Sequence, residues 1–483
     1  MEIKLNKTDW IFFLLCLVLG ITAEESFFRG YIGISYLVFI FLFYAVFFWR
    51  FRGFSFSHQR FGYLVLICIW LLAISYSIHI NKLFNVLNVL VIPALVIFHL
   101  ILVTSQKSLP WSKPVFILYL FSKMFATIKY IIGFVAVLFK HQGTENKYVI
   151  WKKILIGFLI SIPVLFVVIN LLMSADTQFE RMMGSIPQLF HFMDDEDIIR
   201  MIIVLIFTFA FFGLLQVLYN KQIKTIIQKE ISLSFKIDAI ISITVLVLIN
   251  AIYLLFTVVQ FKYFFSGNLH GDFTYAEYAR KGFFELLFVT VINLSITVLV
   301  VNFVDNKARL TKRIIQILLT TIVASSAVML SSAFMRLSMY EEAYGFTFIR
   351  LMAFSFMLFL VVIYMYTLFK IWIEKLSLFH FYFISSLLYY TGMNLIDVEK
   401  IVVTKNIERY EQTGKIDPVY LNTLSYSGIL GLIELYEKDS KIPEVKDLLK
   451  ERKNNLSNES VSWQSYNLKR ELAVKKLKQL DNL

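Results

Sequence analysis

Residues 83–104 read L-F-N-V-L-N-V-L-V-I-P-A-L-V-I-F-H-L-I-L-V-T, and this stretch decides the fold class. It contains no Asp, Glu, Lys or Arg. About 20 apolar residues in a helix cross the roughly 30 Å hydrocarbon core of a bilayer. A helix also satisfies its own backbone hydrogen bonds, which lipid cannot do. The sequence therefore predicts a transmembrane helix here.

Ten further stretches have the same character, which predicts an all-α, polytopic membrane helix bundle of about eleven spans. The chain is 58% hydrophobic and only 17% charged, whereas soluble proteins are about 25% charged. The predicted spans cover residues 10–28, 30–49, 61–79, 83–104, 151–173, 198–219, 238–265, 282–303, 314–335, 348–369 and 376–393.

The net charge of +13 is concentrated in the loops on one side of these spans, for example at Arg50, Arg52 and Arg60. The loops on the other side are short and acidic, as in 194–197. By the positive-inside rule this asymmetry predicts a multi-pass protein of the cell membrane with a cytoplasmic amino terminus. It also favours the bilayer, and anionic inner-leaflet lipid in particular, over nucleic acid as the partner of the basic residues.

Residues 115–139 interrupt the pattern, because Lys123 and Lys129 lie within an apolar run. Charges at mid-membrane are costly, while a helix in the headgroup plane can direct lysines into water. We therefore expect a basic interfacial helix on the inner surface, with both lysines in water. The alternative, a twelfth crossing, would reverse every later loop against the charge rule.

After residue 393 the composition becomes polar, which predicts a transmembrane domain over 1–393 and a small helical tail over 394–483. Asp417 and Pro418 are a typical helix start. Further helices are expected near Pro443 and from Trp463. With eleven crossings the tail is extracytoplasmic, and we expect it to rest on the membrane domain.

Cys16 and Cys68 lie in apolar stretches, where isolated thiols are usually packing residues. The histidines show no metal-ligand spacing, and no phosphate-binding glycine loop is present. We therefore expect no metal and no cofactor.

A polar cluster is predicted at the extracytoplasmic ends of several spans. Glu285, about one turn inside a span, requires a cation partner at that depth. Such a cluster is a candidate ligand-binding site, and a structural ion-pair network that fastens the helix ends and the tail is the alternative. Its members are Asp176, Gln260, Tyr275, Glu277, Tyr278, Arg280, Glu285, Arg336, Tyr340, Glu341 and Arg350.

A second motif, E-E-x-x-x-R-G at 24–30, resembles the first motif of intramembrane proteases related to prenyl-protein endopeptidases. In those enzymes histidines on later helices complete the site. Here the F-x-x-x-H match ends at His58 in a basic inner loop, and the third match begins at His191 beside an acidic outer loop. The parts are therefore expected on opposite faces of the membrane.

Several strings resemble one family of bacterial membrane proteins, those containing domains of unknown function 4153 and 4173. The most specific is Y-A-E-Y-A-R-K-G-F at 275–283, and F-F-R-G-Y-I-G-I-S-Y at 27–36 and S-W-Q-S-Y-N-L at 462–468 also match. The resemblance implies one membrane domain with an attached tail. It implies no catalytic residue, because the family has no established activity.

The leading hypothesis is a non-enzymatic membrane protein whose polar cluster binds a small ligand, a lipid or a membrane protein partner. A secondary transporter or permease component is the first alternative, and an intramembrane protease is the second. A transporter requires a polar cavity that reaches the middle of the bilayer.

Overall fold

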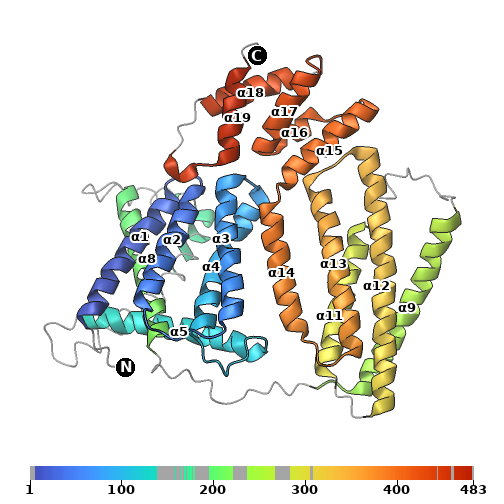
Figure 1. Cartoon of the computed structure of the whole chain (residues 1–483), viewed down its shortest axis with the longest axis horizontal. Coiled ribbons are helices and arrows are strands. Elements are labelled where there is room, and N and C mark those ends of the chain that lie inside the picture. The colour runs from blue at the N-terminus through green and yellow to red at the C-terminus, as the bar shows by residue number, and fades with distance from the viewer. Residues whose placement is uncertain are drawn as a thin grey trace. The chain divides into compact units, whose positions relative to one another are not determined.

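The computed structural model confirms an all-α protein (Figure 1). It describes residues 6–138, 195–220, 236–266, 283–304, 308–442, 444–457 and 462–480, together with part of 157–179. Within these residues the regular structure consists of helices and one isolated bridge between Ile237 and Val304.

The chain forms two compact units. The first unit comprises 1–77, 87–230 and 461–467, and the second comprises 78–86, 231–460 and 468–483. The domain boundary predicted at residue 393 stays a prediction, because the second unit contains residues on both sides of it.

The described residues of the first unit form six largely apolar helices and one short 3-10 turn. Their bounds are α1 Lys7–Phe28, α2 Ile34–Arg50, α3 Gln59–Ile78, α4 Lys82–Thr104, α5 Pro114–Leu138, α8 Asp195–Tyr219 and η3 Trp463–Ser465.

Helices α1 and α8 pack antiparallel around a cluster of phenylalanine rings. The ring of Phe13 lies 5.2 Å from that of Phe212 in α8 and 5.4 Å from that of Phe134 in α5. At the start of α1, Arg50 of α2 donates to Asp9 Oδ1 at 2.5 Å and to Gln216 Oε1 of α8 at 2.8 Å. These contacts tie three helices together at one end of the unit.

Helix α5 lies across the ends of the other helices of this unit rather than alongside them (Figure 1). That arrangement supports the interfacial helix, although α5 is long and apolar enough to cross a membrane. The expectation that both lysines face water is wrong for Lys123, which is only 7% exposed. Its Nζ lies 5.4 Å from the centre of the Tyr119 ring, a contact that favours a buried cation. Lys129 is exposed.

Before the tail, the described residues of the second unit form five more largely apolar helices. Their bounds are α9 Ala239–Ser266, α11 Phe283–Phe303, α12 Arg309–Tyr344, α13 Phe348–Trp372 and α14 Leu378–Leu395. Side-chain hydrogen bonds cross the core of this bundle, from Tyr253 to Asn293 at 2.5 Å and from Asn293 to Ser326 at 2.9 Å. Such bonds between uncharged groups hold membrane helices together.

The second unit also includes the tail, which has an apolar core of its own around Leu432, Leu435 and Leu449. Its helices are α15 Val398–Thr413, α16 Pro418–Thr423, α17 Tyr426–Lys438, α18 Val445–Ser457 and α19 Leu468–Gln479. Asp417 caps α16 as predicted, with Tyr420 N donating to Asp417 Oδ1 at 2.8 Å. The helix expected from Trp463 begins only at Leu468, because residues 463–465 form the separate turn η3.

Nine helices among the described residues are long and apolar enough to cross a membrane: α1, α3, α4, α5, α8, α9, α11, α12 and α13. Helix α2 is apolar but only 17 residues long, and α14 is more polar than these nine. Most of the predicted span 151–173 lies outside the described residues. Cys16 and Cys68 are buried free thiols, as predicted.

Candidate functional site

The predicted polar cluster is only partly assembled by the part of the chain that the structure describes. Tyr275, Glu277, Tyr278 and Arg280 lie outside the described residues. Of the others, Tyr340, Glu341 and Arg350 come together at the turn between α12 and α13. We call the helix ends that contact the tail residues the tail-side ends.

The turn between α12 and α13 is closed by Arg350. Its Nη1 donates to Gly345 O at 2.5 Å, and its guanidinium lies 4.0 Å from the centre of the Tyr340 ring. Gly345 adopts a φ of +82°, which a residue with a side chain rarely adopts. Glu341 is buried at 6% exposure, and its Oε1 has no hydrogen-bond partner among the described residues.

The tail binds the backbone of this turn. Asn406 of α15 accepts from Phe346 N at 3.1 Å and donates to Phe346 O at 2.8 Å. Arg409 donates to Ala343 O at 3.0 Å, and the hydroxyl of Tyr420 accepts from Phe348 N at 2.8 Å. These contacts fasten a helix end to the tail, which is the structural alternative to a binding site.

Three other predicted residues, Asp176, Gln260 and Glu285, do not join this group in the described structure. Asp176 is exposed and accepts from Gln178 N at 2.7 Å within its own turn. Gln260 is buried and accepts from Ser332 Oγ at 2.9 Å. Glu285 is exposed on α11 and forms no ion pair with Arg336 or Arg350 among the described residues, and the other two cations expected at its depth, Arg280 and Lys281, lie outside them.

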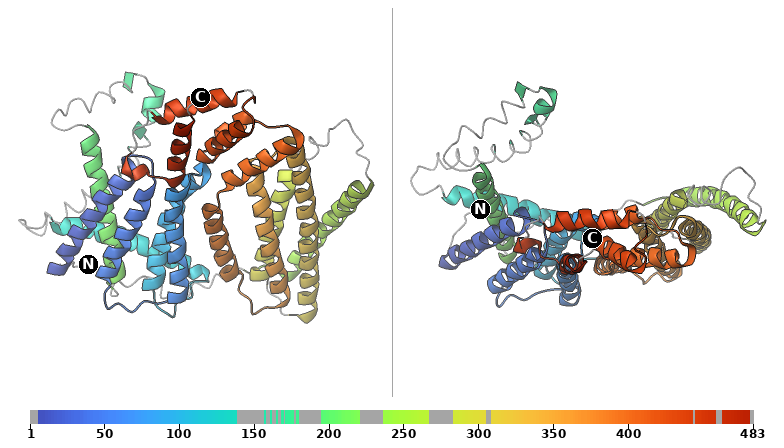
Figure 2. Two further views of the ribbon diagram at one scale, coloured as in Figure 1. Left: turned by 45° about the horizontal axis from the view of Figure 1, so that its top comes forward. Right: turned by 90° about the horizontal axis from the view of Figure 1, so that it is seen from above.

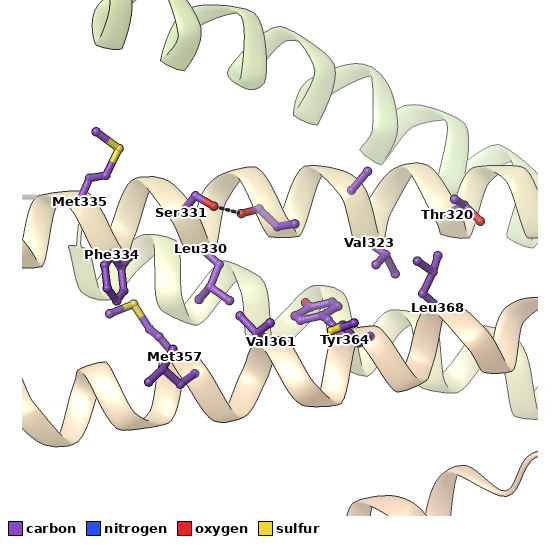
Figure 3. A pocket seen from close by; sticks show the side chains of 14 residues that line it. Thr320, Val323, Leu330, Ser331, Phe334, Met335, Met357, Val361, Tyr364 and Leu368 are labelled. Carbon is purple, nitrogen blue, oxygen red and sulfur yellow. Dashed lines mark hydrogen bonds between the residues drawn. The ribbon is translucent and has the colours of Figure 1, made fainter.

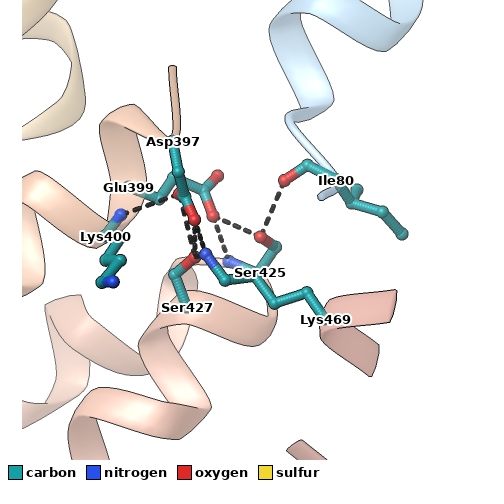
Figure 4. A network of polar contacts seen from close by, with 7 residues as sticks. All are labelled: Ile80, Asp397, Glu399, Lys400, Ser425, Ser427 and Lys469. Atoms are coloured by element: carbon teal, nitrogen blue, oxygen red, sulfur yellow. Dashed lines mark hydrogen bonds and ion pairs between the residues drawn. The ribbon is translucent and has the colours of Figure 1, made fainter. Parts of the chain in front are cut away.

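A denser polar network, which the sequence analysis missed, lies where α15 begins (Figure 4). The Ser425 hydroxyl lies within hydrogen-bond distance of both Ile80 O, at 2.8 Å, and Glu399 Oε2, and Ser425 N donates to the same carboxylate at 3.0 Å. Lys469 of α19 pairs with Asp397 and donates to Ser427 Oγ at 2.8 Å. The network joins three tail helices to the segment between α3 and α4. We call these residues the tail node.

Burial changes the acid–base properties of the tail node. It raises the pKa of Glu399, against the opposing effect of the Ser425 hydrogen bonds and the positive charge of Lys82. Burial likewise lowers the pKa of His79, which lies beside the node, and the charge of Lys469 lowers it further. Both groups therefore favour their neutral forms.

The E-E-x-x-x-R-G motif forms an ion-pair cluster in the first unit. Arg29 pairs with Glu25 at 2.8 Å and with Glu24 at 3.5 Å, and Arg200 of α8 lies 3.5 Å from Glu24. His58 precedes α3 at the opposite end of α2 from these glutamates. Over the described residues no group of three or more His, Cys, Asp and Glu side chains is arranged to hold a metal ion. The protease motif thus meets arginines rather than His58.

An open groove runs along α12 and α13, with a volume of about 530 Å³ (Figure 3). Phe334, Met335 and Met357 lie toward one end, and Thr320 and Leu368 lie at the other. The groove is almost entirely apolar. Its lining comprises Thr320, Val323, Ala324, Ala327, Leu330, Ser331, Phe334, Met335, Met357, Leu358, Val361, Tyr364, Met365 and Leu368.

The two helices are fastened at both ends of the groove. Beyond Thr320, Trp372 Nε1 donates to the threonine hydroxyl at 3.2 Å, and Gln316 donates to Ile371 O at 2.8 Å. At the tail-side end the rings of Phe334 and Phe354 pack edge to face, 4.7 Å apart. Between these ties the small side chains of α12 leave the space unfilled.

The polar residues of the groove are already satisfied. Ser331 donates to Ala327 O at 2.9 Å, and the hydroxyl of Tyr364 donates to Thr290 O at 2.5 Å. The groove therefore offers apolar contact rather than hydrogen bonds. A transporter for a polar solute requires a polar cavity in the middle of the membrane, whereas this groove is apolar.

The comparisons with known proteins identify the family. The sequence pattern of the Domain of unknown function (DUF4153) matches residues 66–435, which is most of the chain. The chain belongs to this family. No curated protein and no solved structure matches it.

The match defines which features fall within the family domain. The α12–α13 groove, the turn at Gly345 and most of the tail node lie inside 66–435, while Lys469 and η3 lie beyond it. The resemblance to domain of unknown function 4173 has no such support. Together with its apolar helices, the family match identifies the chain as a multi-pass membrane protein.

Proposed function

We propose that this DUF4153 protein is a non-enzymatic membrane protein that binds a long-chain amphiphile, a lipid or a lipid-like molecule, between α12 and α13. The apolar chain of the ligand lies in the groove, and its polar head lies at the tail-side turn around Arg350. The observation that carries the proposal is the groove itself, which is apolar, open and held open by ties at both ends.

The dimensions of the groove fit an extended hydrocarbon chain. From Thr320 to Met335 it follows α12 for about 22 Å, given a rise of 1.5 Å per residue. The uncharged stretch of α12, residues 314–335, is about 33 Å long by the same measure and matches the hydrocarbon core. The groove therefore lies within the hydrophobic depth of the helix and ends at its tail-side boundary.

Arg350 is placed to recognise the head of such a ligand. On α13, Arg350, Phe354, Met357 and Val361 follow one another at spacings of four, three and four, so they share the face that lines the groove. Bulk lipid is as apolar as the groove, so transfer of the chain alone provides little selectivity. Selectivity comes instead from close packing of the chain in the groove and from the charge of Arg350, which attracts the head.

Filling the groove tests the proposal. Ala324 and Ala327 line it and are exposed, so replacing both by Leu places branched side chains where the ligand lies. Overpacking of this kind costs about 1–3 kcal/mol, which lowers binding roughly fivefold to a hundredfold. The measurement is photocrosslinking of the purified protein in liposomes by a phospholipid carrying a diazirine in its acyl chain, with crosslinked peptides identified by mass spectrometry.

The matched control is Ala251→Leu. Ala251 is exposed on α9 and does not line the groove, so this substitution adds similar bulk and leaves crosslinking to α12 and α13 unchanged. Equal crosslinking in the Ala324→Leu/Ala327→Leu protein and the control would exclude a bound chain in the groove. Crosslinks spread evenly over all lipid-facing helices of the unsubstituted protein would also exclude it.

A further inference from the structure

The turn η3 belongs to the tail in sequence, but it is fastened to the membrane helices of the first unit. Ile34 N donates to Tyr466 O at 3.2 Å, Gln464 donates to Glu25 at 2.5 Å, and Asn467 donates to Tyr76 O at 2.9 Å. The three contacts reach α1, α2 and α3 at their tail-side ends.

Glycines allow this close approach. A side chain at Gly33 would meet Gln464 O at 2.8 Å, and one at Gly30 would meet Ser462 Oγ at 2.9 Å. Residues 462–467 therefore lie directly against the short connection between α1 and α2. Their depth relative to the helices is fixed by these contacts.

Four aromatic side chains remain exposed at this place. Tyr31 is 76% exposed, Phe28 55%, Trp463 51% and Tyr466 41%. Large aromatic rings that water surrounds on a monomer are unfavourable, whereas Trp and Tyr are enriched at the membrane–water boundary. There the ring contacts acyl chains and its polar atom contacts headgroups and water.

The charged residues of α1 indicate that the membrane–water boundary lies at the level of η3. The uncharged part of α1, residues 10–23, is about 21 Å long at 1.5 Å per residue, shorter than the roughly 30 Å core. A short span is matched to the bilayer by flanking residues that remain at the interface. The uncharged part is followed by Glu24 and Glu25 near the end of α1, and Arg29 begins the connection against which η3 packs. Arg29 forms ion pairs with both glutamates.

We propose that η3 and the α1–α2 connection form an interfacial anchor, in which Trp463 and Tyr31 insert into the headgroup layer of the tail-side leaflet. The partner is the phospholipid surface. The anchor is independent of the α12–α13 groove, and it holds residues 462–467 at the membrane surface.

The anchor is tested by measuring the depth of a label at position 463. Cys16 and Cys68 are buried, so Trp463→Cys in the full-length protein accepts a fluorophore such as NBD selectively. In phosphatidylcholine/phosphatidylglycerol liposomes, we expect nitroxide lipids labelled near the headgroup to quench it about twofold or more strongly than lipids labelled deep in the acyl chain, as the interfacial preference of Trp and Tyr implies. Aqueous iodide quenches it weakly.

The matched control is Glu437→Cys, an exposed position on α17 of the tail, whose label iodide quenches and lipid nitroxides do not. Tyr31→Cys repeats the test from the α1–α2 connection in case Trp463→Cys disturbs the turn. Labels at 463 and 31 that respond like the control would overturn the anchor. Labels that neither quencher reaches would also overturn it, since protein rather than lipid would then cover the site.

Discussion

Glu399 shows how single polar residues hold the tail. Its carboxylate is 7% exposed and accepts two hydrogen bonds from Ser425, whose hydroxyl also reaches Ile80 O. Burial raises its pKa more than these bonds and Lys82 lower it. A group with a raised pKa stabilises the folded state below its unfolded pKa, and this contribution is lost as the pH rises through the folded pKa.

Protonation of Glu399 should therefore stabilise the tail node as the pH falls toward the ordinary pKa of a glutamate, since it removes a poorly solvated charge. His79, whose pKa burial lowers, acts in the opposite direction as the pH falls through its ordinary value. Glu399→Gln keeps an acceptor for Ser425 without the charge. We expect this variant to be at least as stable as the parent at pH 7 and to lose the gain in stability that protonation of Glu399 gives the parent at lower pH, while the opposite contribution of His79 remains. Hydrogen exchange of the α15–α17 amides in detergent, corrected for intrinsic rates, measures both effects.

Two further measurements test whether Glu399 holds the tail node. Glu399→Ala removes the acceptor and should increase exchange at both pH values, because the Ser425 N–H is then left without its partner. A Glu399→Gln protein that keeps the full pH dependence of the parent would show that another group titrates. His79, Lys82, Asp397 and Lys469 are the other ionisable groups at the node.

At the scale of elements, hydropathy predicted most of the membrane helices because burial in lipid imposes one rule on every residue of a span. Hydropathy gave a wrong prediction where a local contact stabilises a charged side chain in a buried position. Lys123, for example, is buried with its Nζ 5.4 Å from the centre of the Tyr119 ring.

The functional features were less predictable, because they depend on contacts between distant segments. The groove leaves only a weak trace in the sequence, the small residues Ala324, Ala327 and Ser331 at helical spacing in a bulky span. The predicted cluster treated Gln260 and Glu285 as neighbours of Arg350 from depth alone. Depth along the membrane does not determine which face of a helix a side chain occupies.

Asn406 provides two of the hydrogen bonds between α15 and the α12–α13 turn, beside the one from Arg409. Asn406→Ala leaves Phe346 N and O without their partner, which costs about 1–3 kcal/mol. We expect the amides of residues 343–348 to exchange roughly tenfold faster, as about 1.4 kcal/mol implies. Lys405→Ala is the control, since Lys405 pairs only with exposed Glu408 in the described structure. Similar exchange in both variants would show that Asn406 does not hold the turn.

At the scale of the whole molecule, chain direction constrains the topology. In the first unit α4 ends beside Ser57, whose N–H donates to Val103 O at 2.8 Å. Helix α8 begins at the other end, where Arg200 meets Glu24. The prediction that residues 151–173 cross once between these two helices agrees with this placement of the helix ends. Helix α5 lies across the ends of the other helices of the unit (Figure 2).

Cysteine accessibility tests this topology without assuming how the two units are placed, since each label reports only its own side. Glu342 at the α12–α13 turn, Lys446 in the tail, Arg52 after α2 and Lys129 on α5 are all exposed. The basic loops are expected in the cytoplasm. A membrane-impermeant maleimide should therefore label Glu342→Cys and Lys446→Cys in intact cells, and Arg52→Cys and Lys129→Cys only after permeabilisation.

The unsubstituted chain gives the background, because Cys16 and Cys68 are buried. Labelling of Lys446→Cys only after permeabilisation would place the tail in the cytoplasm and reverse the orientation of every span. Labelling of Lys129→Cys in intact cells, with Arg52→Cys still protected, would instead mean that α5 enters the membrane. This pair of labels therefore tests the interfacial placement of α5 on the cytoplasmic surface against a helix that enters the membrane.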